Sequence, residues 1–347
     1  MVSVLFQKKD IMNLFEPVHT HVTTTAKELS SSGSAFFVIH NDRVVAESYF
    51  GKQSHAEDAR AVQADTQFHV ASVRKAYIGF AAAYAIYNGY FSIDDPIKAF
   101  VKDSHLSAYE GVTFRHLLTH TNGLKTVNGE LISEFVPGES WRYVGPNIDL
   151  LTTIIKNTTG QSVAEIVKTL VFEPMGFQST EWINMLQPHS KIADTIRDGM
   201  DSHWEESDVV DGSRMNMYTS ARELALWGYL HLKRGKWEGK QLIPQEIIQM
   251  STAIQTPNPT LPIQTNGFLW FVKGAEHPCN QIGDSLPKGS YQLLGYTNVA
   301  LLVIPEENLV AVRMLNRFGS PEGFNYLENI RSFGDTVYKC SLGARVF

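Results

Sequence analysis

The chain has 347 residues, of which 43% are hydrophobic and 19% charged, and its formal net charge at pH 7 is −6. These values are typical of a globular protein with a large core. The net charge is negative and the sequence has no basic run of the kind that binds nucleic acid, so we expect no nucleic-acid partner.

The N-terminus, the apolar runs and the cysteines indicate in which compartment the protein is expected. The first nine residues (MVSVLFQKK) lack the apolar core of a secretory signal, and no apolar run is long enough to span a bilayer. We therefore expect a cytoplasmic protein with no membrane segment; its oligomeric state is left open. Cys279 and Cys340 are expected to be free thiols, with a single disulfide as the alternative.

The predicted elements begin with a helix within residues 10–32. A β-hairpin follows, with strands at 35–40 and 43–50 joined by Asn41-Asp42. From about residue 100 to 230 the chain is predicted to be mainly helical. Three strands are then predicted at residues 290–297, 299–304 and 309–315, followed by a last helix at residues 322–339. Strands at both ends with helices between them predict an α/β lobe built from both termini and a helical insertion.

The most informative motif is Ser72-Val73-Arg74-Lys75, which opens an apolar, Ala-rich stretch that ends at Asn88-Gly89. Residues three apart share a helix face, so Ser72 Oγ and Lys75 Nζ are within reach of one hydrogen bond. Serine becomes a nucleophile when a neighbouring base takes its proton, and a partly desolvated lysine is such a base. The alternative is a helix-cap serine and a solvated lysine. A second match, Ser285 to Lys288, is disfavoured because Pro287 interrupts it.

This motif and several later segments resemble the serine β-lactamase and penicillin-binding-protein family, in its class C and esterase-like branch. The segments are TFRHLLTHTNGL (113–124), PGESWRY (137–143), TSARELA (219–225), GFLWF (267–271) and the last hairpin. The resemblance covers residues 30–340 and implies an α+β fold: an antiparallel β-sheet flanked by helices, with a mainly helical second lobe. It implies one domain, with an α/β lobe of about residues 1–65 plus 235–347, a helical lobe of about 66–234, and the active site between them.

The resemblance assigns roles to three residues. The family's nucleophile falls on Ser72, its lysine on Lys75, and the tyrosine of its Tyr-x-Asn motif on Tyr143. Lys75 and Tyr143 are then expected to accept the Ser72 proton, pass it to the leaving group, and activate the deacylating water. The alternative for Tyr143 is an ordinary half-buried aromatic. No cofactor is implied.

Two positions depart from the family pattern. Gly145 replaces the amide of the second motif, and Leu293-Leu294-Gly295 replaces the third motif, Lys/His-x-Gly, so that the glycine is kept and the cation lost. Loss of a charge-assisted hydrogen bond costs about 1.5–3 kcal/mol. We therefore expect esters or neutral amides to suit the site better than anionic β-lactams. The implied oxyanion hole consists of the backbone N–H groups of Ser72 and Tyr296, with a simple bulge as the alternative for Gly295.

Other candidates carry less weight. His116 and His120 have the spacing of two zinc ligands, but no third ligand or catalytic glutamate accompanies them, so no metal is expected. Trp270 and Tyr296 are candidates for the cleft wall, with core packing as an equal alternative for Trp270.

The sequence therefore predicts a serine hydrolase that cleaves esters, small amides or β-lactams through a Ser72 acyl-enzyme, with a small molecule as its partner. The alternative is a β-lactam-binding or sensor protein of the same fold with little turnover. The presence of Ser72, Lys75 and Tyr143 together favours the enzyme, because a binder has no need of all three.

Overall fold

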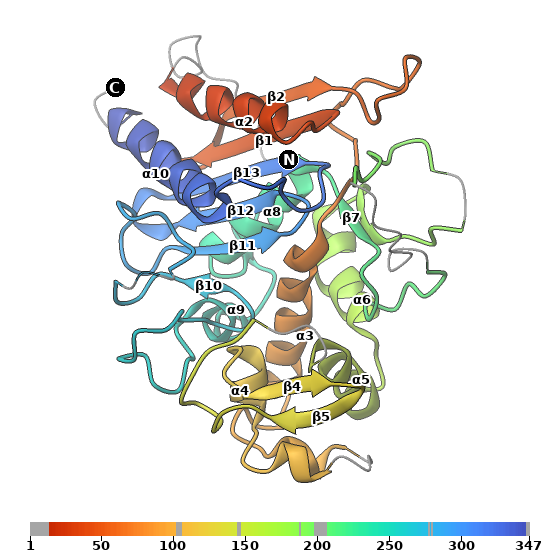
Figure 1. Ribbon diagram of the computed structural model, residues 1–347, viewed down its shortest axis with the longest axis vertical. Helices are drawn as coiled ribbons and strands as arrows, with labels where there is room; N and C mark the ends of the chain where they lie inside the picture. The colour runs from red at the N-terminus through yellow and green to blue at the C-terminus, as the bar shows by residue number, and fades with distance from the viewer. Residues whose placement is uncertain are drawn as a thin grey trace.

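The computed structural model describes residues 14–101, 106–143, 147–186, 189–197, 207–276, 278 and 280–344. Its main sheet has six strands in the order β10-β11-β12-β13-β1-β2, and every neighbouring pair is antiparallel (Figure 1). The strands are β1 (Gly33–His40), β2 (Arg43–Gly51), β10 (Phe271–Val272), β11 (Tyr291–Gly295), β12 (Val299–Ile304) and β13 (Leu309–Leu315). The N-terminal hairpin joins the C-terminal strands because β1 pairs with β13, with Ser34 opposite Leu315.

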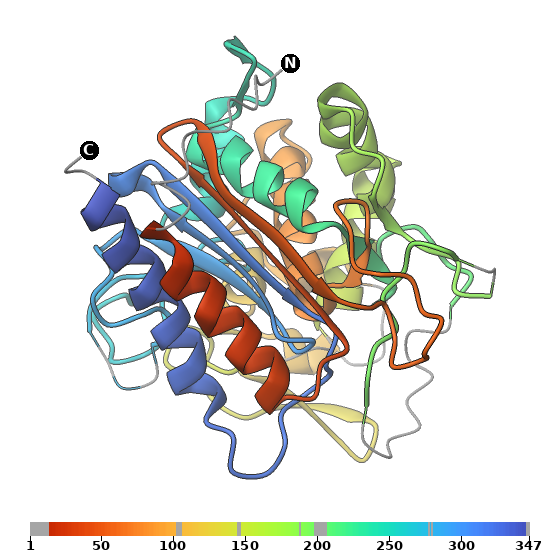
Figure 2. The ribbon, with the colours of Figure 1, turned by 90° about the horizontal axis from the view of Figure 1, so that it is seen from above.

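Helices cover both faces of this sheet. The helices α2 (Glu16–Glu28) and α10 (Tyr326–Ala344) lie side by side on one face, and α8 (Ala221–Leu232) lies on the other (Figure 2). The sheet is therefore apolar on both sides, which explains why β12 (VALLVI) reads as a continuous hydrophobic run. No helix among the described residues is long and apolar enough to cross a membrane.

The remaining elements lie mostly between β2 and β10 in the chain. The helices are α3 (Lys75–Tyr87), α4 (Phe114–Leu118), α5 (Asn147–Thr159), α6 (Val163–Val167), α7 (Glu173–Met175) and α9 (Gln245–Thr252), with a π-helical turn at Lys168–Phe172. Short 3₁₀ turns occur at Ala71–Arg74, Ile97–Ala99, Leu106–Tyr109 and Pro305–Glu307. The small sheets contain β3 (Phe68–His69), β6 (Thr180–Trp182) and β7 (Met217–Thr219), then β4 (Leu124–Val127) with β5 (Glu130–Ser133), and β8 (Lys236–Trp237) with β9 (Lys240–Gln241).

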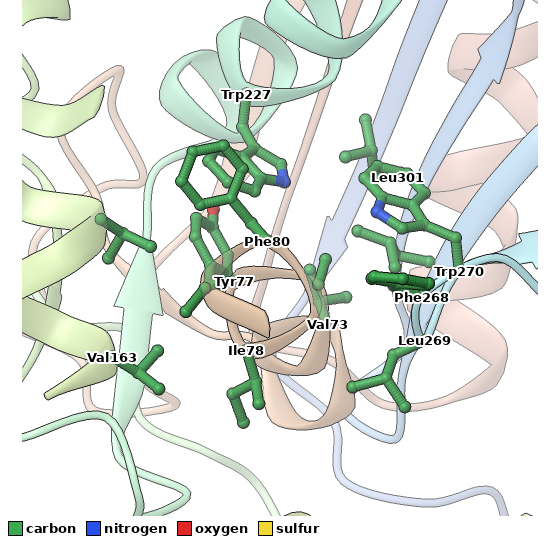
Figure 3. Close-up of a cluster of buried hydrophobic side chains, with 14 of the residues drawn as sticks. Val73, Tyr77, Ile78, Phe80, Val163, Trp227, Phe268, Leu269, Trp270 and Leu301 are labelled. Carbon is green, nitrogen blue, oxygen red and sulfur yellow. The ribbon is translucent and has the colours of Figure 1, made fainter. Parts of the chain in front are cut away.

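The core is built around α3, which is apolar on nearly all sides and runs through the interior (Figures 1 and 3). The ring of Tyr77 stacks on Trp227 of α8 with 4.2 Å between centroids, and Phe80 meets the same indole edge-on. Gly79 permits close packing on a third segment, because a Cβ there would lie 2.3 Å from the Phe268 carbonyl oxygen. This packing holds the start of α3, and with it Ser72, against the sheet.

Most of the predicted elements are confirmed, including both hairpins and the antiparallel sheet flanked by helices. Some boundaries differ. Helix α2 (Glu16–Glu28) lies inside the predicted range of residues 10–32, whereas the last helix runs from Tyr326 to Ala344, later than 322–339. The strand predicted at 290–297 is shorter because β11 ends at Gly295. The division into two lobes at residues 66 and 234 stays a prediction.

Candidate active site

Ser72 follows a strained backbone position. The strand β3 ends at His69, and Ala71, the first residue of the 3₁₀ turn, adopts a left-handed conformation with φ of 45°. Such a conformation costs about 1–3 kcal/mol for a residue other than glycine. The turn leads directly into α3, so the strain is maintained by a buried helix. Ser72 itself is partly exposed and therefore accessible to a substrate.

A chain of hydrogen-bonding atoms links the three predicted catalytic residues. Lys75 Nζ lies 2.7 Å from Ser72 Oγ and 2.8 Å from Tyr143 Oη. The same Nζ lies 4.3 Å from the centroid of the Tyr143 ring. Only 4% of Lys75 is exposed, and this burial lowers the pKa of its ammonium group. The structure therefore brings together a serine, an amine that loses its proton more readily than usual, and a phenol.

Aromatic neighbours fix the position of Tyr143. Its ring lies 6.0 Å from that of Phe271, nearly parallel to it, and 4.7 Å from the imidazole of His120. Trp141 completes the cluster, and its Nε1 donates to Asn266 Oδ1 at 2.8 Å. The Tyr143 side chain is still 39% exposed, so its hydroxyl group is held in place at an accessible surface.

The two histidines of the 113–124 segment have separate positions. His116 Nδ1 accepts from the Thr113 backbone N–H at 3.1 Å and so belongs to the cap of α4. His120 is buried, has a φ of 59°, and packs on Tyr143; burial lowers the pKa of its imidazole to about 3. Within the described parts of the chain, no three His, Cys, Asp or Glu side chains form a metal-ligating group.

The end of β11 lies against the backbone that precedes Ser72. A Cβ on Gly295 would lie 2.4 Å from the Val70 carbonyl oxygen, so only glycine fits there without a shift. Thr297 Oγ1 donates to the His69 carbonyl at 2.6 Å and anchors the same two segments. Tyr296 between them is 55% exposed and meets the Phe318 ring edge-on at 4.8 Å. This arrangement brings Tyr296 beside the nucleophile turn.

The other predicted site positions have different outcomes. Leu293, which the resemblance puts at the place of the family's cation, is 2% exposed, pairs with Leu301 in β12 and belongs to the core. Trp270 is fully buried in the core cluster (Figure 3), so its expected place on the cleft wall is wrong and the core alternative holds. Its ring lies 5.0 Å from that of His231 and 5.1 Å from that of Tyr291. The free energy gained by burying the large apolar surface of the indole outweighs the cost of burying its single N–H group. Gly145 lies outside the described residues, as does Cys279.

The second Ser-x-x-Lys match is a surface turn. Ser285 Oγ donates to Asp335 Oδ1 at 2.6 Å, and Lys288 is exposed. Cys340 is a buried free thiol.

Sequence reasoning missed two neighbours of the site. Phe271, which stacks on Tyr143, stands in the GFLWF segment but has no chemical signal of its own. Arg74, between Ser72 and Lys75, is 4% exposed although an arginine at this place reads as a surface charge. The sequence signal that could have identified Arg74 is its position inside the Ser72–Lys75 motif.

Comparisons with known proteins show the family and the fold. The sequence profile of the Beta-lactamase family matches residues 18–333. The chain is 52% identical to an uncharacterized protein of Alkalihalophilus pseudofirmus over 96% of its own length and 98% of that protein. It is 27% identical to Esterase EstB of Burkholderia gladioli over 37% of this chain and 41% of the esterase.

A solved structure shows the same fold. A penicillin-binding protein homologue from Caulobacter crescentus superposes with a TM-score of 0.73 at 17% identity, covering 94% of this chain and 98% of the homologue. The family profile spans most of the chain, and the fold agrees along nearly its whole length. The chain therefore belongs to the Beta-lactamase family and has the serine hydrolase-type fold of that family.

Proposed function

We propose that this protein is a serine hydrolase that cleaves esters through a covalent acyl-enzyme on Ser72. The observation that carries the proposal is the contact of Lys75 Nζ with both Ser72 Oγ and Tyr143 Oη, at 2.7 and 2.8 Å. Distances of this length allow a proton to pass along the chain of three groups. A serine that only capped a helix would need neither partner.

In the acylation step, the Lys75–Tyr143 pair accepts the Ser72 proton while Oγ attacks the ester carbonyl carbon. The carbonyl oxygen then carries the negative charge, and the backbone N–H groups of Ser72 and Tyr296 stabilise it. The bond to the leaving alkoxide breaks, and the pair returns the proton to that oxygen. In deacylation the same pair takes a proton from water, whose oxygen attacks the acyl carbon. The bond between that carbon and Ser72 Oγ breaks, and the pair returns the proton to Oγ.

The substrate preference follows from the third motif. By the resemblance, Leu293 takes the place of the cation that would meet the carboxylate of a β-lactam. Phe271 and Trp141 add aromatic surface around Tyr143. A neutral ester loses nothing at such a site, whereas an anion loses a charge-assisted hydrogen bond worth about 1.5–3 kcal/mol. We therefore place neutral esters before small amides, and both before β-lactams.

The test compares two substrates on the same protein. Steady-state hydrolysis is measured for a neutral p-nitrophenyl ester and for a penicillin, each with the wild type and Ser72→Ala. The proposal expects ester turnover that disappears in Ser72→Ala and a kcat/KM for the ester well above that for the penicillin. Ester turnover that survives in Ser72→Ala would refute the nucleophile; a penicillin preference would refute the substrate assignment.

A further inference from the structure

Arg74 is a buried cation beside the proposed catalytic pair. Its Nε donates to Met215 Sδ at 2.8 Å, which is a weak acceptor, and its Nη1 has no hydrogen-bond partner among the described residues. No carboxylate of the described chain forms an ion pair with it. Burying a guanidinium without such a partner costs folding free energy. Packing alone therefore gives no reason for an arginine at this position.

The charges around Lys75 and Tyr143 come from several elements. Arg74 lies on the same turn as Ser72 and interacts electrostatically with Lys75 and Tyr143. Asp149, on the exposed side of α5, acts on Arg74 with the opposite sign. His120 is neutral, and Tyr326 of α10 also interacts electrostatically with Tyr143. Arg74 is thus the fixed positive charge next to the pair, in a buried region where charges act more strongly than in water.

The protonation state of the pair has a simple charge balance. With both titratable protons present, Lys75 and Tyr143 together carry a charge of +1. After one proton leaves, the pair is neutral overall, whichever of the two atoms keeps the other proton. A neighbouring fixed cation disfavours the +1 state and leaves the neutral state unpenalised. The neutral state is the one that can accept a proton from Ser72.

We propose that Arg74 is a positioning residue whose fixed charge keeps the Lys75–Tyr143 pair in its neutral, proton-accepting state near pH 7. It contacts no reacting atom and acts only through the pair. The inference rests on the proposed function, because the proton that the pair accepts is that of Ser72. According to this inference, the Lys75–Tyr143 pair needs Arg74 as a third group in order to accept a proton at neutral pH.

The experiment measures kcat/KM against pH for a neutral p-nitrophenyl ester. In Arg74→Gln the acid limb of the profile should move to higher pH by about one unit, because a cation next to the pair has been removed. Arg74→Lys keeps the charge and should restore the limb nearly to its wild-type position.

A matched control separates local from overall charge. Arg222→Gln makes the same change in net charge, but Arg222 lies on α8 and pairs with Glu47 of β2 at 2.8 Å. Its profile should not move. Thermal unfolding of each variant shows whether it is folded.

The outcomes are separable from those of the proposed function. A wild-type protein without Ser72-dependent ester hydrolysis refutes the function before any Arg74 variant is made. With that activity present, an Arg74→Gln acid limb at the wild-type pH overturns the inference, and so does an Arg74→Lys limb displaced as far as that of Arg74→Gln. Should Arg74→Gln fail to fold, Arg74→Met decides: an acid limb moved to higher pH supports the inference, and an unmoved limb overturns it.

Discussion

Replacing Gly295 with alanine tests whether β11 positions the oxyanion hole. The new Cβ would lie 2.4 Å from the Val70 carbonyl oxygen, and neither atom belongs to a flexible side chain. Comfortable contacts lie near 3.5–4.0 Å, so β11 and the Ser72 turn must separate by on the order of 1 Å. A misplacement of about 1 Å at a catalytic site can cost about 10²-fold in rate. We therefore expect kcat/KM for a neutral ester to fall by about 10²-fold.

The assay pairs this variant with Gly343→Ala as a control. A Cβ at position 343 meets nothing closer than Leu14 Cδ2 at 3.8 Å, so the control should keep wild-type activity. Overpacking typically costs about 1–3 kcal/mol, so Gly295→Ala should melt a few degrees lower and stay folded at 25 °C. A folded Gly295→Ala with kcat/KM within threefold of the wild type would contradict the role given to this contact.

Three further predictions concern the catalytic phenol, a buried histidine and a core indole. Tyr143→Phe should lower kcat by about 10²–10⁴-fold, as expected for a lost general acid–base, and a loss under threefold in steady-state assays would remove Tyr143 from the chemistry. Burial lowers the pKa of His231 to about 4, so the unfolded chain binds a proton that the folded chain does not between about pH 4 and 6.5. The free energy of unfolding therefore falls as pH falls through this window. In urea titrations, His231→Gln should reduce the slope of this free energy against pH by about 1.4 kcal/mol per pH unit. An unchanged slope would refute the lowered pKa of His231. Trp270→Ala should cost about 3–5 kcal/mol in the same titrations because the indole is fully buried, and a loss below 1 kcal/mol would contradict the core placement.

The parts of the fold that could be predicted are those with a local signal. The alternating and apolar runs of the two hairpins, and the Ala-rich stretch after Ser72, each identify an element from neighbouring residues alone. The extension of the last helix to Ala344 depends on how α2 and α10 pack on each other, which no local pattern contains.

The candidate site divides in the same way. Ser72 and Lys75 are three residues apart, so their contact follows from helix geometry. Tyr143 lies 68 residues after Lys75, and only the resemblance to the family identified it. The burial of Trp270 and Arg74 could not be predicted, because a tryptophan or an arginine beside a site is equally compatible with the surface and the core. Tertiary packing decides between these alternatives, and the sequence of one chain does not record it.

The most direct test of the central claim is the mass of the intact protein after rapid mixing with an activated ester and acid quenching, with the modified peptide then sequenced by fragmentation. The account predicts a transient acyl group on Ser72 that forms within one turnover, decays by hydrolysis, and accumulates when deacylation is slower than acylation. Ser72→Ala should show no such mass. Turnover of the ester with the acyl group on another residue, or with Ser72→Ala fully active, would contradict the account.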